Sequence, residues 1–139
     1  YYENYRRENI MIENWIVPCN VKFFDVVSYF KNHSEIIWRK GPSIHVGDMV
    51  YVYVGAPYSQ IKFKCEVLQV SIDKETLENN SYAIKNDNYK ANNYMRLKLI
   101  NEIPDGQLKY IELKQHGLGQ VQTQARTDRK LQAYLDEME

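Results

Sequence analysis

Cysteine, proline and glycine are all scarce in this chain of 139 residues, which contains two, four and six of them. The two cysteines, Cys19 and Cys65, form neither the disulfide framework of a small secreted domain nor a metal-binding knuckle. The sequence also has no internal repeat and no low-complexity segment. These absences predict a reduced, cytoplasmic protein.

Charge of one sign is not in excess either, because 18 lysines and arginines balance 18 aspartates and glutamates. A neutral protein does not coat DNA broadly through electrostatic attraction. Any binding of nucleic acid must therefore depend on a local patch or pocket. Long hydrophobic runs are missing as well, so the sequence predicts no membrane span and no secretory leader.

Common catalytic motifs are absent from the sequence. Its histidines, His33, His45 and His116, are scattered and show no His-Glu-x-x-His spacing. No Gly-x-Ser-x-Gly elbow and no Gly-x-x-x-x-Gly-Lys loop occurs. We therefore expect a protein that is not an enzyme and that uses no metal or other cofactor. One alternative stays open, a Cys19 nucleophile paired with a histidine, because such partners meet in space and not in sequence.

The length fits one domain, which would bury about two-thirds of the surface of the unfolded chain. The first residue is Tyr1 and the first methionine is Met11. We expect residues 1–10 to be an N-terminal extension or linker and residues 11–139 to form the domain. A chain that begins without Met also fits a domain cut from a larger protein. Asn and Asp cluster over residues 73–93, which predicts a long loop between two strands.

Four segments have the residue pattern of β-strands. Residues 14–18 form the first, which Pro18 is expected to end because proline cannot donate to a strand ladder. Residues 48–55 are apolar on both alternating sets, which predicts a strand covered on both faces. The third and fourth, residues 61–70 and 94–100, alternate between apolar and polar positions. In the third, the inward set is Ile61, Phe63, Cys65 and Val67, and the outward set is Lys62, Lys64 and Glu66.

Two segments have the apolar spacing of amphipathic helices. The first follows Asn20, its expected N-cap, and its apolar face is Phe23, Val26, Val27 and Phe30. The second follows Thr127, its expected N-cap, and its apolar stripe is Leu131, Tyr134, Leu135 and Met138. Together with the strands, these helices predict an α+β fold with a mixed sheet.

The two tryptophans are the most informative residues for function. Trp15 stands at a predicted strand, and Trp38 lies shortly before the strand at residues 48–55. Two indole rings can grip a planar ligand from both sides, and stacking contributes roughly 1–3 kcal/mol per base. This stacking energy can offset the few kcal/mol that are needed to take a base out of its stack. The alternative is that both tryptophans are ordinary core residues.

The order of several features resembles the EVE domain, a member of the PUA-like superfamily that also includes the YTH and ASCH domains. The resemblance extends over nearly the whole chain from Trp15 onward. It is carried by the segment Trp15–Asn20, the step Ile37-Trp38, the turn Gly47-Asp48 before Tyr51 and Tyr53, the step Tyr94-Met95-Arg96, and the loop Gly117–Arg126 before the last helix. No one of these features is specific alone, but their common order is.

This resemblance implies both a fold and a function. The fold is a PUA-like mixed β-barrel of about five to six strands with two or three flanking helices. The function is a reader module that takes a flipped, modified base, such as 5-methylcytosine, 5-hydroxymethylcytosine or N6-methyladenine, into an aromatic pocket. DNA is favoured over RNA as the partner. A subset of bacterial EVE proteins has a Trp-Arg step, as at Trp38-Arg39, and often accompanies a nuclease in a restriction system.

The resemblance also assigns residues to the site. The base-binding pocket would be formed by Trp15, Pro18, Asn20, Trp38 and Tyr53. Contacts to the nucleic-acid backbone or base edges would come from Arg39, Lys40, Gln122, Gln124, Arg126, Arg129 and Lys130. Many family members have other residues at the positions of Pro18-Cys19-Asn20 and at Arg39, which affects the polar contacts more than the aromatic walls.

Each assignment has a simpler structural alternative. Asn20 can be a helix cap, Tyr53 can be a core residue, and the basic side chains can be solvated. For the whole protein, the alternative function is a domain that holds another small planar ligand or a protein partner on the same barrel, without nucleic acid.

Overall fold

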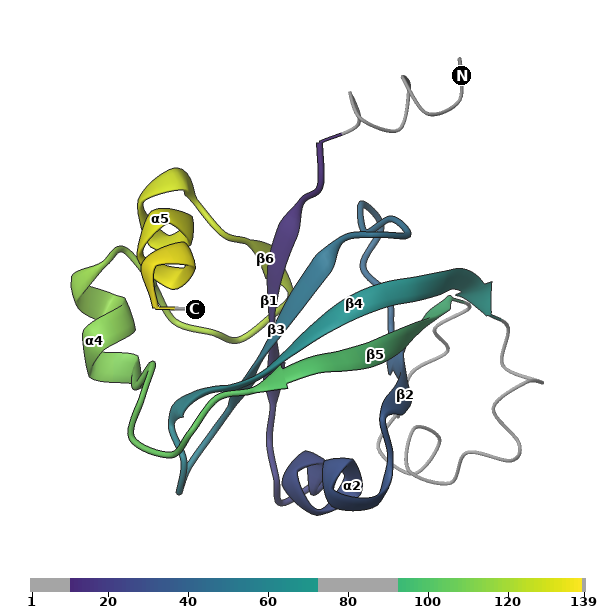
Figure 1. Ribbon diagram of the computed structural model, residues 1–139, viewed down its shortest axis with the longest axis horizontal. Coiled ribbons are helices and arrows are strands. Elements are labelled where there is room, and N and C mark those ends of the chain that lie inside the picture. The colour runs from purple at the N-terminus through teal and green to yellow at the C-terminus, as the bar shows by residue number, and fades with distance from the viewer. Residues whose placement is uncertain (1–10, 73–92, 139) are drawn as a thin grey trace.

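A computed structural model describes residues 11–72 and 93–138, so the expected extension at residues 1–10 and nearly all of the expected loop at residues 73–93 lie outside the described residues. In the described part, six strands form one sheet and three helices flank it (Figure 1). The strands are β1 (Asn14–Cys19), β2 (Glu35–Arg39), β3 (Met49–Val54), β4 (Gln60–Ile72), β5 (Tyr94–Glu102) and β6 (Ala125–Arg126). The helices are α2 (Val26–Asn32), α4 (Tyr110–Gln115) and α5 (Arg129–Glu137). The predicted α+β class is confirmed.

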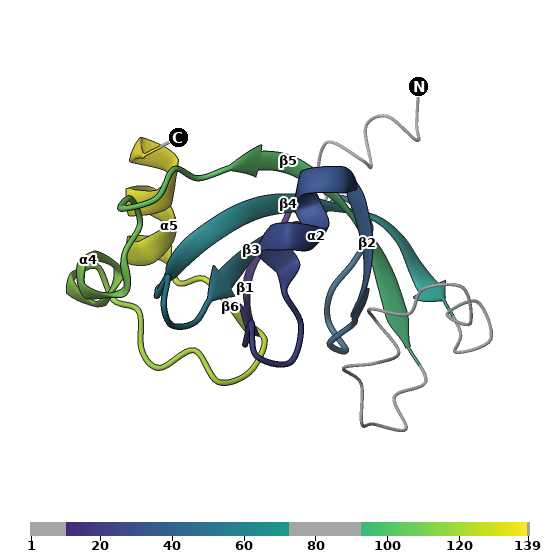
Figure 2. The same ribbon diagram turned by 90° about the horizontal axis from the view of Figure 1, so that it is seen from below.

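The sheet is mixed and runs in the order β2-β5-β4-β3-β1-β6. β1 and β3 are parallel, and the other neighbouring strands are antiparallel. The sheet is strongly curved (Figure 2), but strand pairing does not join β2 to β6 within the residues that the structure describes. The predicted barrel is therefore corrected to an open, curved sheet. No helix in these residues has the length and hydropathy needed to cross a bilayer.

β3 is covered on both faces, as its sequence predicts. Val50, Val52 and Val54 are fully buried on one face, in a cluster that includes side chains of α2. Tyr51 points to the opposite face, where it packs in a second cluster with Leu113 of α4 and with side chains of α5. Two hydrophobic cores therefore lie on the two sides of β3.

Pro18 does not end β1, which continues to Cys19. The Asn14 carbonyl accepts from the Thr127 amide, so the backbone groups of Asn14 face β6. Every second residue of a strand directs its backbone groups to the same side, so Pro18 also faces the side of β6. β6 pairs only with Trp15 and Ile16, so β1 has a free edge at Pro18. Proline is tolerated there because no ladder bond needs its missing N–H.

A bulge in β4 changes the predicted alternation of this strand. Val52 of β3 is opposite Phe63, but Tyr53 is opposite Ile61, so Lys62 is the extra residue. Ile61 consequently packs in the second core, whereas Phe63 packs in the first. The prediction that both residues share one face was wrong.

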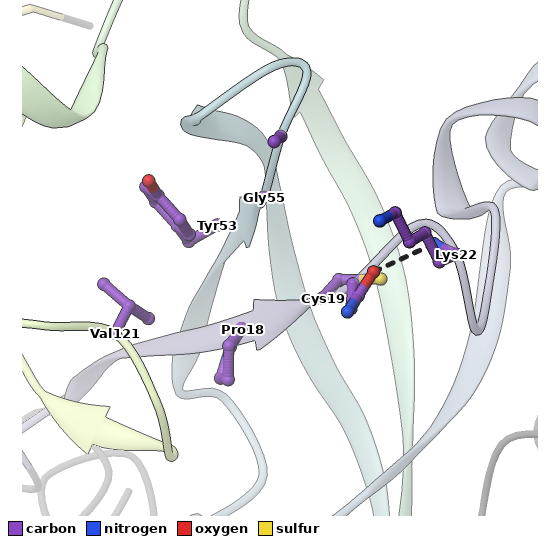
Figure 3. A pocket seen from close by; sticks show the side chains of 8 residues that line it. Pro18, Cys19, Lys22, Tyr53, Gly55 and Val121 are labelled. Carbon is purple, nitrogen blue, oxygen red and sulfur yellow. Dashed lines mark hydrogen bonds between the residues drawn. The ribbon is translucent and has the colours of Figure 1, made fainter.

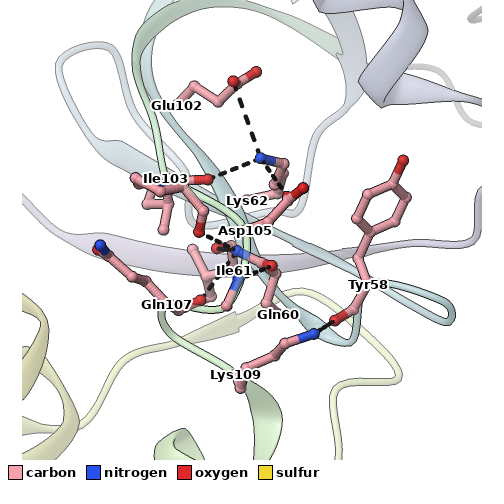
Figure 4. A network of polar contacts seen from close by, with 11 residues as sticks. Tyr58, Gln60, Ile61, Lys62, Glu102, Ile103, Asp105, Gln107 and Lys109 are labelled. Carbon is pink, nitrogen blue, oxygen red and sulfur yellow. Dashed lines mark hydrogen bonds and ion pairs between the residues drawn. The ribbon is translucent and has the colours of Figure 1, made fainter.

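Lys62 is buried, although the alternation predicts that it faces water. Its Nζ atom donates to the carbonyl of Ile103 at 2.9 Å and pairs with the Asp105 carboxylate at 2.8 Å (Figure 4). The bulge turns the side chain toward this segment, and the partners satisfy its charge in the protein interior.

Gln60 forms a second polar anchor beside Lys62 (Figure 4). Its Nε2 atom donates to the carbonyls of Pro104 and Gln107 at 3.1 and 3.0 Å, and its Oε1 atom accepts from the Gly106 amide at 3.2 Å. These bonds fix the turn after β5. The turn leads directly into α4, so Gln60 helps to set the position of Tyr110 at the start of that helix.

The predicted cap of the first helix is also corrected. Asp25, and not Asn20, caps α2, with its Oδ1 atom accepting from the Ser28 amide at 3.1 Å. Asn20 instead stabilises the turn that precedes the helix, because its Oδ1 atom accepts from the Lys22 amide at 3.0 Å. The helix therefore starts at Val26, later than its apolar pattern suggests, and Phe23 lies outside it with 71% of its surface exposed.

The predicted N-cap of the last helix is corrected as well, by one residue. Asp128 caps α5 by accepting from the Leu131 amide at 2.7 Å. Thr127 instead pairs with β1, because its amide donates to the Asn14 carbonyl at 2.9 Å. Leu131 and Leu135 are buried as predicted, whereas Met138 is exposed.

Candidate functional site

A hollow of about 270 Å³ lies at the carboxyl end of β1 (Figure 3). Three segments form it: the end of β1 with the following turn, the end of β3 with its turn, and the loop that precedes β6. The lining residues are Pro18, Cys19, Asn20, Lys22, Tyr53, Gly55, Ala56 and Val121. Pockets for drug-sized ligands have volumes of about 300–1,000 Å³, so this hollow suits a ligand no larger than a base or a nucleoside.

Three of the five predicted pocket residues, Pro18, Asn20 and Tyr53, lie together in this hollow. They come from β1, from the turn after it and from β3. Because β1 and β3 are parallel neighbours with Pro18 opposite Tyr53, the sheet brings these residues side by side. The segment at residues 18–20, which the resemblance assigns to the pocket, therefore lies at this hollow.

Tyr53 presents an aromatic ring with a fixed orientation to the hollow. Its ring packs edge to face against Tyr110, with 6.1 Å between the ring centres. Burial raises the pKa of the Tyr53 hydroxyl, and a hydrogen bond with Ser59 acts in the opposite direction. The hydroxyl is consequently protonated at neutral pH and can both donate and accept a hydrogen bond.

Asn20 and Lys22 supply the polar side of the hollow. The Oδ1 atom of Asn20 is used by the Lys22 amide, which leaves the Asn20 amide nitrogen with two N–H donors for a ligand. Both side chains are exposed, so they can rearrange around a bound molecule. Lys22 adds a positive charge that the sequence pattern did not single out, although it lies only two residues after Asn20.

Trp15 belongs to the first hydrophobic core and is not among the residues that line the hollow. Only 7% of its surface is exposed. Its indole nitrogen donates to the Asp48 carboxylate at 2.9 Å, and the Arg126 guanidinium lies 5.1 Å from the centre of its ring. Arg126 also pairs with Glu13 at 3.4 Å. The contacts of Trp15 are those of a core residue.

Trp38 is half-buried in β2 and also lies outside the lining of the hollow. Its ring packs edge to face against Phe24, with 5.9 Å between the ring centres, and it joins the edge of the first core. The structure therefore does not place the two indoles as facing walls of the hollow.

The loop Gly117–Arg126 reaches both the hollow and the end of β2. Val121 lines the hollow, and three residues later the Nε2 atom of Gln124 donates to the Arg39 carbonyl at 2.7 Å. Lys40 follows Arg39 and donates from Nζ to the Gly41 carbonyl at 2.9 Å. Arg39, Lys40 and Gln124 are therefore brought together.

The other predicted contact residues are more dispersed. Gln122 is exposed and donates to the Gln120 side chain at 2.9 Å. Arg129 and Lys130 are exposed in the first turn of α5. None of these three side chains lines the hollow.

Cys19 lines the hollow, but its thiol is a poor nucleophile. Burial raises the pKa of the Cys19 thiol to about 12, so the thiol is protonated at neutral pH. The Sγ atom donates to the Phe24 carbonyl at 3.4 Å. No group of three His, Cys, Asp or Glu side chains suited to a metal ion occurs among the described residues.

No protein-family model matches this chain, and no curated protein matches it either. Solved structures do match its fold. ASCH from Zymomonas mobilis superposes with a TM-score of 0.66 at 12% identity, with 91% of this chain and 95% of that chain covered. The chain has the fold of an ASCH domain.

Two further structures resemble this ASCH-like fold. A hypothetical protein from Leishmania major has a TM-score of 0.64 at 16% identity and covers 92% of this chain and 94% of its own. A protein from Pseudomonas putida has a TM-score of 0.63 at 14% identity, with coverages of 90% and 98%. At identities of 12, 16 and 14%, these structures show a likeness of fold alone. The narrower resemblance to EVE domains remains a property of the sequence alone.

Within this ASCH-like fold, the hollow combines groups that a planar heterocycle needs. The ring of Tyr53 and the side chains of Pro18 and Val121 offer apolar contact, Asn20 offers amide donors, and Lys22 offers a positive charge. Such a set can bind and orient a small ligand.

Proposed function

We propose that this chain is a nucleic-acid-binding module that takes a single flipped base into the hollow at the end of β1. The observation that carries the proposal is the composition of that hollow. The hollow has a volume of about 270 Å³ and is lined by the ring of Tyr53, which packs against Tyr110, by the amide of Asn20 with two N–H donors, and by the cation of Lys22. Tyr53 stacks on or packs against the base, Asn20 donates to its edge, and Lys22 approaches the phosphate.

The base is proposed to be a modified one, such as 5-methylcytosine, 5-hydroxymethylcytosine or N6-methyladenine. The apolar side chains of Pro18, Ala56 and Val121 stand in the lining beside Tyr53. A methyl group placed against them leaves water, which stabilises the complex by about 0.8 kcal/mol per buried methylene equivalent. Preference for a methylated base from this term alone is modest, about fourfold.

The resemblance to EVE domains at Trp38-Arg39 supports DNA as the nucleic acid and a nuclease as the effector, in the same or a separate chain. We propose a binding role and not a catalytic one for this domain. The raised pKa of the Cys19 thiol supports this role, because it disfavours the open alternative of a cysteine nucleophile.

The test is fluorescence-polarisation binding of short oligonucleotides that carry one of the three marks or none. We expect one mark to bind most tightly, and we expect Tyr53→Leu and Asn20→Ala to remove that preference. Asn101→Ala is the matched control, because Asn101 is exposed on β5 and outside the lining of the hollow.

Lys22→Ala tests the phosphate contact against Lys98→Ala, an exposed lysine on β5 that is also outside the lining. Affinity should fall as salt is added, with a slope that is reduced only in Lys22→Ala. Equal, weak and salt-independent binding of every oligonucleotide by all variants would overturn the proposal. The zero net charge of the chain would then favour the alternative of a neutral planar ligand.

A further inference from the structure

A side chain of the loop before β6 contacts the opposite end of the open sheet. β2 and β6 are the first and last strands of the sheet, and they are not paired with each other in the part of the chain that the structure describes. Gln124 lies directly before β6 and donates to the carbonyl of Arg39, the last residue of β2, at 2.7 Å. This contact joins residues that are 85 positions apart in the sequence.

The orientation of the Gln124 amide is fixed by its partner. The Arg39 carbonyl only accepts, so Nε2 must face it and Oε1 must face away. Oε1 then lies against Gly41, where it is buried and has no hydrogen-bond partner. A Cβ atom built on Gly41 would stand only 2.7 Å from this oxygen, so Gly41 is needed for the close approach.

The two contacts of the Gln124 amide have opposite effects on the free energy. The position in which Gln124 contacts Arg39 is therefore only marginally stable. One hydrogen bond stabilises it, and one buried acceptor without a partner offsets part of that stabilisation. The Arg39 residue is exposed, so water can replace Gln124 when the loop moves away. The hydrogen bond from Gln124 to Arg39 can therefore form and break reversibly.

We propose that Gln124 is a latch that holds the loop Gly117–Arg126 over the hollow and sets how long a ligand stays there. The same loop carries Val121, which lines the hollow three residues before Gln124. Gln124 is thus a positioning residue that acts through Val121. The effect on the ligand rests on the proposed function, whereas the latch itself can be tested without any ligand.

The first test is hydrogen exchange of the Thr127 amide, which lies three residues after Gln124 and donates to the Asn14 carbonyl at 2.9 Å. It is measured in Gln124→Met, which keeps the side-chain length but can neither donate nor accept through an amide. Exchange of the Thr127 amide should become roughly two- to tenfold faster, the range that corresponds to the net contribution of one hydrogen bond. The thermal midpoint should change little, because water satisfies the Arg39 carbonyl. Unchanged exchange in Gln124→Met would overturn the latch.

The second test approaches the latch from the opposite side. In Gly41→Ala the added Cβ collides with the Gln124 oxygen, so this variant should also speed exchange of the Thr127 amide. In the double variant with Gln124→Met, the two effects should be less than additive because they break the same contact. Gly119→Ala is the control, since its added Cβ meets nothing within 4 Å. Fully additive effects would refute the mechanism.

With the best-bound oligonucleotide, Gln124→Met and Gly41→Ala should each raise the dissociation rate by roughly two- to tenfold and leave the association rate nearly unchanged. An unchanged dissociation rate beside faster exchange would overturn the link between the latch and the ligand. If the unmodified protein binds no oligonucleotide, the proposed function fails, and the exchange data still decide whether Gln124 is a latch.

Discussion

At the scale of single residues, Asp48 explains the role of Trp15. Asp48 is 3% exposed, and its carboxylate accepts hydrogen bonds from the Trp15 indole, the His45 amide and the Glu13 amide at 2.9, 2.9 and 3.1 Å. A buried carboxylate is tolerated when several donors surround it. The Gly47-Asp48 turn thus joins the starts of β1 and β3, and the indole of Trp15 is part of this joint.

We predict that Asp48→Asn lowers the free energy of unfolding by about 3 kcal/mol, because an amide nitrogen would face donors where an oxygen now accepts. Urea unfolding followed by tryptophan fluorescence measures this loss. Asp136→Asn, which changes an exposed aspartate of α5, should have little effect. Similar losses in both variants would show that the Asp48 contacts do not stabilise the fold.

At the scale of elements, the segment between β1 and α2 differs most from its sequence pattern. The apolar spacing predicts a helix that begins just after Asn20, but the chain first makes a turn and then begins the helix at Val26. Both Asn20 and Asp25 are good N-cap residues, so the residue type could not decide between them. The turn keeps Asn20 at the hollow instead of at a helix end.

We predict that Asp25→Ala lowers the free energy of unfolding by about 1 kcal/mol, the usual cost of a lost N-cap. Asn20→Ala should cost about 0.5 kcal/mol or less, because it removes one exposed turn bond. The Ser28 amide lowers the pKa of the Asp25 carboxyl. The cap therefore stabilises the fold fully above the ordinary pKa of 3.8 and loses its effect at lower pH. A larger loss for Asn20→Ala than for Asp25→Ala would contradict this assignment.

At the scale of the whole molecule, the first core contains both cysteines of the chain. Burial raises the pKa of the thiols of Cys19 and Cys65 from the ordinary value of 9.0 to about 12. Between these values the unfolded chain releases the two protons while the folded chain retains them. The folded state is therefore fully favoured below pH 9 and loses stability as the pH rises toward 12.

We predict a loss of about 1.4 kcal/mol in the free energy of unfolding per pH unit for each thiol in this window. The measurement is urea unfolding at pH 9 and pH 10 for the unmodified chain and for Cys65→Ala. The variant should be less stable at both values but should lose less between them. The same pH slope in both proteins would mean that Cys65 ionises in the folded core.

Several features of the fold could be read from residues alone because they depend on local periodicity. The double covering of β3 follows from its two apolar sets, and the buried pair Leu131 and Leu135 follows from helical spacing. The segment at residues 18–20, which the resemblance assigns to the pocket, lies at the hollow. The bulge at Lys62 could not be predicted, since it depends on the pairing of β4 with β3.

The sequence by itself determined the α+β class, four of the six described strands, two of the three described helices and the net charge of zero, because these depend on composition and on spacing along the chain. Only the tertiary structure decided which residues surround the hollow. Parallel pairing of β1 with β3 brings Tyr53 to Pro18, and the loop before β6 adds Val121. It also decided that Trp15 serves the core, since the indole meets Asp48 from a distant part of the sequence. Contacts between distant segments depend on how the sheet curves, which no local pattern encodes.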